Sequence, residues 1–259
     1  MASMYTYDDL LSALRGAGIC EGDDVFIHSN IGFFGRLNGV SSSQELCDRF
    51  IQALQEVLGP KGTLVLPTFT YSFCHGEIFD PNTTVSQCGM LPERMRTRPE
   101  ALRSGDPNFS VVAEGENAAF YTGTWSHEAF GDGSFWEKLL SKNGRIACFN
   151  FDCGSTFVHY VEHLSQVPYR YNKAFNGIRF ENDRMIRDYA VHYVYDLDCP
   201  QDSPCFSRLD TIVRRQSFCK IAPLGRGEML SFPAKDYMEL IVKTLKTRPR
   251  FLTWEEGNE

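Results

Sequence analysis

The chain of 259 residues has 42% hydrophobic and 23% charged residues, which is ordinary for a globular protein with a sizeable core. Its 26 basic and 33 acidic side chains give a formal net charge of −7, which argues against general nucleic-acid binding because that needs a basic surface. A membrane span would need a run of about 18 apolar residues, and the sequence contains none.

Helices and buried strands alternate in the first part of the chain. Leucines at helical spacing, followed by glycines, predict a helix over residues 7–17. The short apolar runs Asp24–Ser29 and Thr63–Pro67 predict buried strands. Between them, apolar residues at every fourth position predict a helix over Ser43–Leu58, which a Gly-Pro pair ends.

A loop-rich segment over residues 68–125 separates this part from the rest. The clearest later element is an antiparallel hairpin over residues 174–197, where side chains alternate and Asn182 and Asp183 supply a turn. The other predicted elements are helices over residues 91–97, 134–141, 156–166 and 236–246, a strand over 145–151, and a strand-to-helix segment over 113–120.

This order of elements predicts a single α/β domain over residues 1–259. We expect a central, mixed and mostly buried sheet that is flanked by helices, plus the C-terminal antiparallel hairpin. No basic start followed by an apolar block marks a signal peptide, and the nine cysteines show no C-x-x-C spacing. We therefore expect a cytoplasmic protein with reduced cysteines, and a homo-oligomer stays open.

The segment over residues 149–166 carries the strongest chemical signal. A strand there runs through a small-residue turn into a helix, at the kind of sheet end where α/β proteins bind ligands. At about 100° per residue, the polar side chains share one face, and a solvated helix surface is the simplest alternative explanation. The apolar face holds Phe157, Val158, Val161 and Leu164, and the polar face holds Thr156, His159, Glu162, His163 and Gln166.

Three chemical interpretations of the polar face remain open. In the first, His159 is a general base, Glu162 orients it or holds a cationic substrate group, and Thr156 donates its hydroxyl to an oxyanion or a leaving thiolate. In the second, His159, Glu162 and His163 match the short H-x-x-E-H zinc-peptidase pattern. In the third, Cys153 is a nucleophile with His159 as its base.

Short motifs at other strand ends extend this signal along the chain. They are His28-Ser29, Gly62-Thr63 with Pro67-Thr68-Phe69-Thr70, Arg103-Ser104, Pro107 with Ser110, Gly131 with Ser134, and Pro249-Arg250-Phe251-Leu252. Together with Thr156-x-x-His159-x-x-Glu162, their order and spacing resemble the aminoglycoside 3-N-acetyltransferase family. The resemblance covers nearly the whole chain.

The resemblance implies an α/β acetyltransferase that takes its acyl group from acetyl-CoA, needs no metal, and acetylates an amino group on a sugar-like ring directly. It implies that His159 deprotonates the amine, that Glu162 orients the base or the acceptor, and that Thr156 binds the thioester. By the same analogy the pantetheine arm passes Ser29, Asn30 and Ile31, with Thr68 and Thr70 nearby. The residues implied for the CoA phosphates are Arg103, Ser104, Ser110 and Ser134, with a loop-locking role as the alternative for Arg103.

One departure from the family pattern concerns the acceptor. Family members that modify aminoglycosides carry Arg-Ser-x-His-Pro-x-x-Ser, and Asp106 stands at the His position here. Members in surface-polysaccharide pathways look closer, so we expect an amino-sugar acceptor, nucleotide-linked or free. Asp106 faces that acceptor or caps the turn before Pro107, and Arg170 meets an anionic part of it or lies on the surface. The departure also leaves open a catalytically inactive relative that only binds or assembles.

Overall fold

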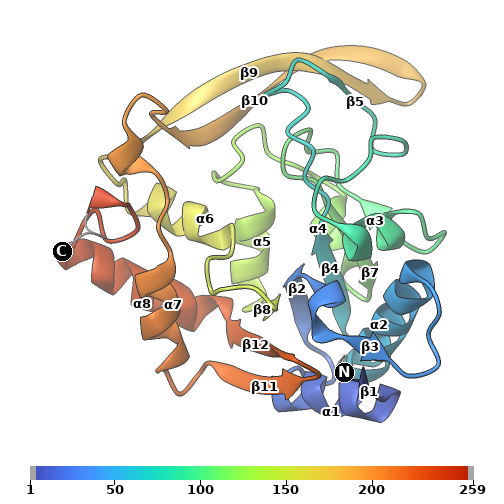
Figure 1. Ribbon diagram of the computed structural model, residues 1–259. Coiled ribbons are helices and arrows are strands. Elements are labelled where there is room, and N and C mark those ends of the chain that lie inside the picture. The colour runs from blue at the N-terminus through green and yellow to red at the C-terminus, as the bar shows by residue number, and fades with distance from the viewer. Residues whose placement is uncertain (1–3, 256–259) are drawn as a thin grey trace.

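A seven-stranded mixed sheet between two layers of helices forms the centre of the molecule (Figure 1). Its strands are β2 (Asp24–Ser29), β4 (Thr63–Pro67), β6 (Leu102–Arg103), β7 (Val111–Gly115), β8 (Arg145–Phe149), β11 (Lys220–Leu224) and β12 (Gly227–Pro233). In the order β11-β12-β8-β2-β4-β7-β6, β2 pairs in parallel with β8 and β4, and the outer pairs are antiparallel. This confirms the predicted α/β class and mixed sheet. The computed structural model describes residues 4–255, so residues 1–3 and 256–259 of the predicted domain lie outside the described residues.

The helices form one layer on each face of the sheet. The first layer is α1 (Tyr7–Gly16), α2 (Ser43–Leu58) and α3 (Met90–Arg96), and the second is α4 (Ala118–Thr122), α5 (Phe135–Ser141), α6 (Phe157–Leu164), α7 (Ser207–Arg214) and α8 (Ala234–Thr247). Successive strand residues point to opposite faces, so Val25 and Ile27 of β2 pack with the first layer and Phe26 packs with the second. Helix α6 is thereby fixed against the sheet through Phe157 and Val161.

The predicted hairpin is confirmed and arches over the top of the molecule in Figure 1. Strand β9 (Arg170–Glu181) pairs along its whole length with β10 (Arg184–Tyr195), and β5 (Ile78–Phe79) adds a short parallel strand to β9. Asn182 and Asp183 have positive φ angles of 49° and 60°, as the tight turn requires. The hairpin belongs to a separate three-stranded sheet, so the mixed character of the central sheet comes from its own antiparallel strands.

The backbone ends two predicted elements early. The predicted strand over residues 145–151 stops at Phe149, since Asn150 has a φ of 51°. The predicted helix over residues 156–166 stops at Leu164. The assignment of Leu164 to the core face is wrong, because this last helical residue is 50% exposed where the chain turns away.

The remaining elements are short, apart from the unpredicted antiparallel pair β11–β12. They are β1 (Met4–Tyr5), which pairs in parallel with β3 (Arg36–Leu37), and two 3-10 turns, Ile31–Phe34 and Pro200–Asp202. Within residues 4–255, no helix is both long enough and apolar enough to cross a membrane.

Candidate active site

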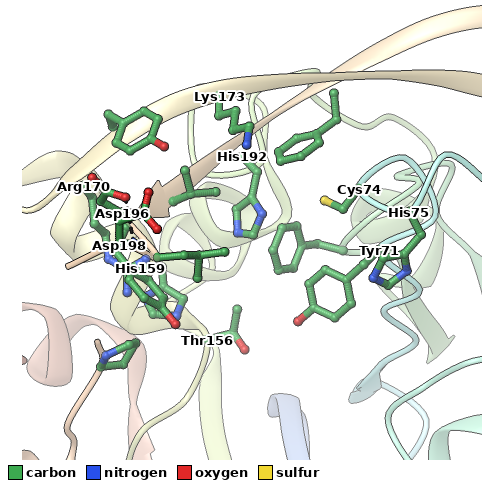
Figure 2. A pocket seen from close by; sticks show the side chains of 17 residues that line it. Tyr71, Cys74, His75, Thr156, His159, Arg170, Lys173, His192, Asp196 and Asp198 are labelled. Atoms are coloured by element: carbon green, nitrogen blue, oxygen red, sulfur yellow. Dashed lines mark hydrogen bonds between the residues drawn. The ribbon is translucent and has the colours of Figure 1, made fainter. Parts of the chain in front are cut away.

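A cavity of about 760 Å³ lies between helix α6 and the β9–β10 hairpin (Figure 2). Its volume is typical of sites that bind small molecules. Its walls come from the loop after β4, the start of α6, both hairpin strands and the segment that follows β10. Segments that are far apart in the sequence therefore meet around one space, and Thr156 and His159 line it from the side of α6.

The turn before α6 is held in place by a half-buried histidine of β2, His28. His28 Nε2 accepts hydrogen bonds from the backbone N–H of Thr156 at 3.3 Å and from the hydroxyl of Ser155 at 3.0 Å. Both contacts require an unprotonated Nε2 atom, and burial lowers the pKa of His28 to about 4. The imidazole thus satisfies an N–H group at a helix start, where no partner exists within the helix, and fixes where α6 enters the cavity.

His159 is paired with a buried carboxylate one helical turn away. Its Nδ1 atom lies 2.6 Å from Glu162 Oε2, and its side chain is 19% exposed against 1% for Glu162. The Tyr169 hydroxyl donates to Glu162 Oε1 at 2.7 Å, and Arg170 Nε forms an ion pair with Oε2 at 2.8 Å. Because an ionised carboxylate only accepts, the proton of His159 sits on Nδ1, and Nε2 keeps its lone pair.

The surrounding charges leave His159 neutral and Glu162 ionised near neutral pH. Burial and the positive charge of Arg170 lower the pKa of His159, and Glu162 offsets only part of this effect. Burial alone would raise the pKa of Glu162, but Arg170 and His159 outweigh it and hold that pKa below its ordinary value. A neutral imidazole that is oriented by a carboxylate has the form of a general base.

The predicted residues of α6 therefore come together with Arg170. Glu162 lies behind His159 in the protein interior, so the solvated-face explanation is wrong for this side chain. The surface alternative for Arg170 is also wrong, because its side chain is 4% exposed, pairs with Glu162 and donates to the Tyr193 carbonyl at 3.2 Å.

Arg103 braces loops outside the cavity walls. Its Nε donates to the hydroxyls of Thr68 and Ser110 at 3.2 Å, and its other nitrogens donate to the backbone oxygens of Pro81, Thr84 and Thr68. Thr68 and Ser110 also bond to each other at 3.1 Å. These contacts support the loop-locking alternative and give no support to a CoA-phosphate role for these residues.

Four more predicted residues hold the local backbone. Ser104 and Ser134 accept hydrogen bonds from backbone N–H groups, and Thr70 donates to a backbone carbonyl. Asp106 accepts from two backbone N–H groups at 2.8 Å each, so it caps its turn. Asp106 is not among the residues that line the cavity, and its role toward the acceptor stays a prediction.

The predicted pantetheine path lies at the end of β2, beside the cavity walls and not among them. Ile31 packs in the core with the first helical layer, and Asn30 begins a 3-10 turn. The Ser29 hydroxyl is buried without a hydrogen-bond partner among residues 4–255. An unpaired buried hydroxyl suits a polar ligand group. Binding of the pantetheine arm by this segment stays a prediction.

The alternative chemistries do not fit the geometry. His163 packs edge-on against Tyr193, with ring centroids 5.1 Å apart, and does not line the cavity. In the described part of the chain, no three His, Cys, Asp or Glu side chains gather as a metal site. Cys153 is buried in the core, and a hydrogen bond with Cys219 together with burial raises the pKa of its thiol. A reactive thiolate at Cys153 is therefore disfavoured.

Part of the cavity wall was not predicted from the sequence. His192 of β10 faces the cavity, and burial together with His159 and Arg170 lowers its pKa to about 3, so its ring is uncharged. Alternation in the hairpin predicted strands, but which strand face meets α6 depends on long-range packing. The unpredicted polar wall residues include Tyr71, Cys74, Lys173, His192, Asp196 and Asp198.

Comparison with known proteins gives a consistent result. A family model described as Aminoglycoside 3-N-acetyltransferase matches residues 26–246. The aminoglycoside N(3)-acetyltransferase III of Pseudomonas aeruginosa is 25% identical over 268 residues, which cover 94% of this chain and 94% of that protein.

Solved structures show the same fold. AAC-IIIb in a binary complex with CoASH matches with a TM-score of 0.79 and 24% identity, over 95% of this chain and 98% of that one. A variant of the aminoglycoside acetyltransferase AAC(3)-IVa in complex with gentamicin matches with a TM-score of 0.79 and 22% identity, over 100% of this chain and 95% of that one.

Proposed function

The chain belongs to the aminoglycoside 3-N-acetyltransferase family and is an acetyltransferase, and we propose that it acetylates the amino group of an amino sugar with His159 as the general base. The acyl donor is acetyl-CoA, in keeping with the CoASH bound to the similar structure AAC-IIIb. One observation carries the proposal: His159, on the cavity wall, has its Nδ1 atom 2.6 Å from the buried Glu162 carboxylate.

The proton balance of the reaction explains the need for this pair. The neutral acceptor nitrogen attacks the thioester carbonyl carbon, and His159 Nε2 takes the proton that the nitrogen must lose. A C–N bond forms, the C–S bond breaks, and the sulfur leaves as a thiolate that regains a proton from His159 or from water. Positioned proton transfer contributes about 10²–10⁴-fold, and holding both substrates in one cavity supplies orientation. Thr156 offers its hydroxyl to the carbonyl or the leaving sulfur.

The cavity walls support an acceptor that carries more than one charge. Asp196 and Asp198 line the cavity, and carboxylates attract the ammonium groups of an amino sugar. The gentamicin bound to the similar AAC(3)-IVa variant supports an aminoglycoside-like acceptor. Lys173 lines the same cavity, which supports the narrower proposal of an amino sugar with an anionic group, such as a nucleotide-linked one.

Thiol release from acetyl-CoA tests the proposal, with aminoglycosides, free amino sugars and nucleotide-linked amino sugars as acceptors. We expect thiol release with at least one acceptor, and His159→Ala should lower kcat by about 10²–10⁴-fold. His163→Ala is the matched control, because it removes the other imidazole of α6 outside the cavity and should keep most of the activity. Full activity in His159→Ala would contradict the assigned base. Failure to bind any CoA ester in calorimetry would instead favour an inactive binding relative.

A further inference from the structure

Tyr71 has a strained backbone on the cavity wall. This residue of the loop after β4 has a φ of 52°, a left-handed conformation that a bulky side chain rarely adopts. Among residues 4–255, every other non-glycine residue with a positive φ is an asparagine, an aspartate or a glutamine. Backbone strain of this kind gathers at functional sites, where surrounding contacts impose it.

Hydrogen bonds on both sides of Tyr71 impose this conformation. The Asn108 carbonyl accepts from the backbone N–H groups of Thr70 and Tyr71, at 3.1 and 3.3 Å. The backbone N–H of His75 donates to the Tyr71 carbonyl at 3.1 Å, and Gln87 Nε2 donates to the Thr70 carbonyl at 2.9 Å. The loop is therefore fixed before any substrate binds.

The phenol of Tyr71 is held by aromatic packing, and its hydroxyl is free. The ring lies edge-on to Phe109 at 5.3 Å and stacks on His192 at 6.4 Å between centroids. In Figure 2 the hydroxyl points into the cavity, on the side where Thr156 lies. It makes no hydrogen bond to any residue of the described chain. Strain thus places an unpaired donor where the substrates would meet.

We propose that Tyr71 donates a hydrogen bond to the thioester carbonyl oxygen and stabilises the negative charge that develops there during attack by the amine. This inference rests on the proposed acetyl transfer. His159 and Thr156 reach the cavity from α6, and Tyr71 reaches it from the loop after β4. A fixed donor binds the developing oxyanion more strongly than the ground-state carbonyl, so its contribution appears in kcat.

The two cationic side chains at the cavity suit this role less well than Tyr71. Arg170 is paired with the Glu162 carboxylate, and the exposed Lys173 side chain places its ammonium over the Phe175 ring, 5.2 Å from the centroid. Burial, with smaller contributions from Cys88 and Cys74, raises the pKa of Tyr71 to about 12. The phenol therefore stays protonated throughout the working range, and no proton leaves it during the reaction.

Tyr71→Phe tests the role, because it keeps the ring and the backbone strain and removes only the hydroxyl. We expect kcat to fall by about 10²-fold, by the same factor with two chemically different acceptors, while the KM of each acceptor and the affinity for CoA stay unchanged. Tyr189→Phe is the control, since it removes a hydroxyl from an exposed hairpin tyrosine outside the cavity. If Tyr71→Phe raised the KM of the acceptor and left kcat unchanged, Tyr71 would contact the acceptor and the proposal would be overturned. A kcat equal to that of the wild type would also overturn it.

A fluorinated tyrosine at position 71 gives a second readout that a structural role would not move. Its more acidic phenol should support catalysis at low pH and add a falling limb to the pH profile of kcat as the phenol ionises. A profile that matches the wild type would overturn the proposal. The proposed acetyl transfer fails if the wild type is inactive, and the assigned base fails if His159→Ala is fully active. Neither result depends on Tyr71, so these failures are distinguishable from a failure of the Tyr71 proposal.

Discussion

Replacing Glu162 by glutamine separates the orientation of His159 from the packing of α6. The substitution keeps the shape of the side chain and removes the charge 2.6 Å from His159 Nδ1. A glutamine amide can donate an N–H to Nδ1, which favours the tautomer that carries its proton on Nε2. That tautomer has no lone pair for the acceptor amine, so we expect kcat/KM to fall by about 10²–10⁴-fold.

The same substitution leaves the buried guanidinium of Arg170 without its carboxylate partner. The Arg170 side chain is 4% exposed and would keep only the Tyr193 carbonyl, at 3.2 Å, as a hydrogen-bond acceptor. Removing one partner of a buried ion pair costs about 3–5 kcal/mol of unfolding free energy. Natural domains have about 5–15 kcal/mol in total, so the variant should fold but with a clearly lower Tm. The double variant Glu162→Gln with Arg170→Met removes this unpaired charge, so it should recover much of the lost stability while its activity stays low.

The pH profile gives the sharpest check on this reasoning. Glu162 raises the pKa of His159 against the opposing effects of burial and Arg170. Without the carboxylate, that pKa should fall further, so the rising limb of kcat/KM against pH should move to lower pH in Glu162→Gln. Steady-state kinetics across the acid range, together with thermal unfolding of the single and double variants, measure both effects. A limb that moves to higher pH, or near-normal activity, would refute the orienting role of Glu162.

Two further substitutions test the residues around the site. His28→Ala should loosen the start of α6 and cost about 1 kcal/mol at neutral pH. Between pH 6.5 and about 4, this histidine is protonated in the unfolded chain and not in the folded one, so the free energy of unfolding falls by up to about 1.4 kcal/mol for each unit that the pH falls. The variant lacks this histidine and should show a flatter dependence of stability on pH. Denaturant titrations at several pH values measure it, and an unchanged slope would contradict the prediction. Arg103→Met should lower Tm and leave CoA affinity unchanged in calorimetry, whereas a large loss of affinity with a normal Tm would return Arg103 to the phosphate site.

Short-range patterns predicted what depends on short-range geometry. His159 and Glu162 are one helical turn apart, so their pairing follows from helix geometry, and the hairpin turn follows from the tolerance of Asn182 and Asp183 for positive φ. The long-range parts were not predictable in the same way. Tyr71 and His192 meet only because the hairpin folds over the loop after β4, and no local pattern encodes that approach.

The polar motifs at strand ends show a different limit. Arg103, Ser110 and Asp106 are residue types that bind phosphates or substrates, and they also cap turns and brace loops. Which role holds depends on whether nearby backbone groups already satisfy the side chain, and in this fold they do. The sequence identified positions that matter for the loops, but their spacing alone could not separate support from ligand binding.

The burial of Glu162 is what distinguishes a catalytic arrangement from an ordinary helix surface. An isolated buried carboxylate would shift its pKa upward and neutralise, yet Glu162 stays ionised because Arg170, His159 and Tyr169 surround it. A hydrophobic residue of similar size would often stabilise such a position at least as well. Packing therefore does not require the charge at Glu162. Of its partners, His159 and Arg170 line the cavity, and only His159 can accept a proton there. The buried carboxylate therefore serves to fix the tautomer and the direction of that base.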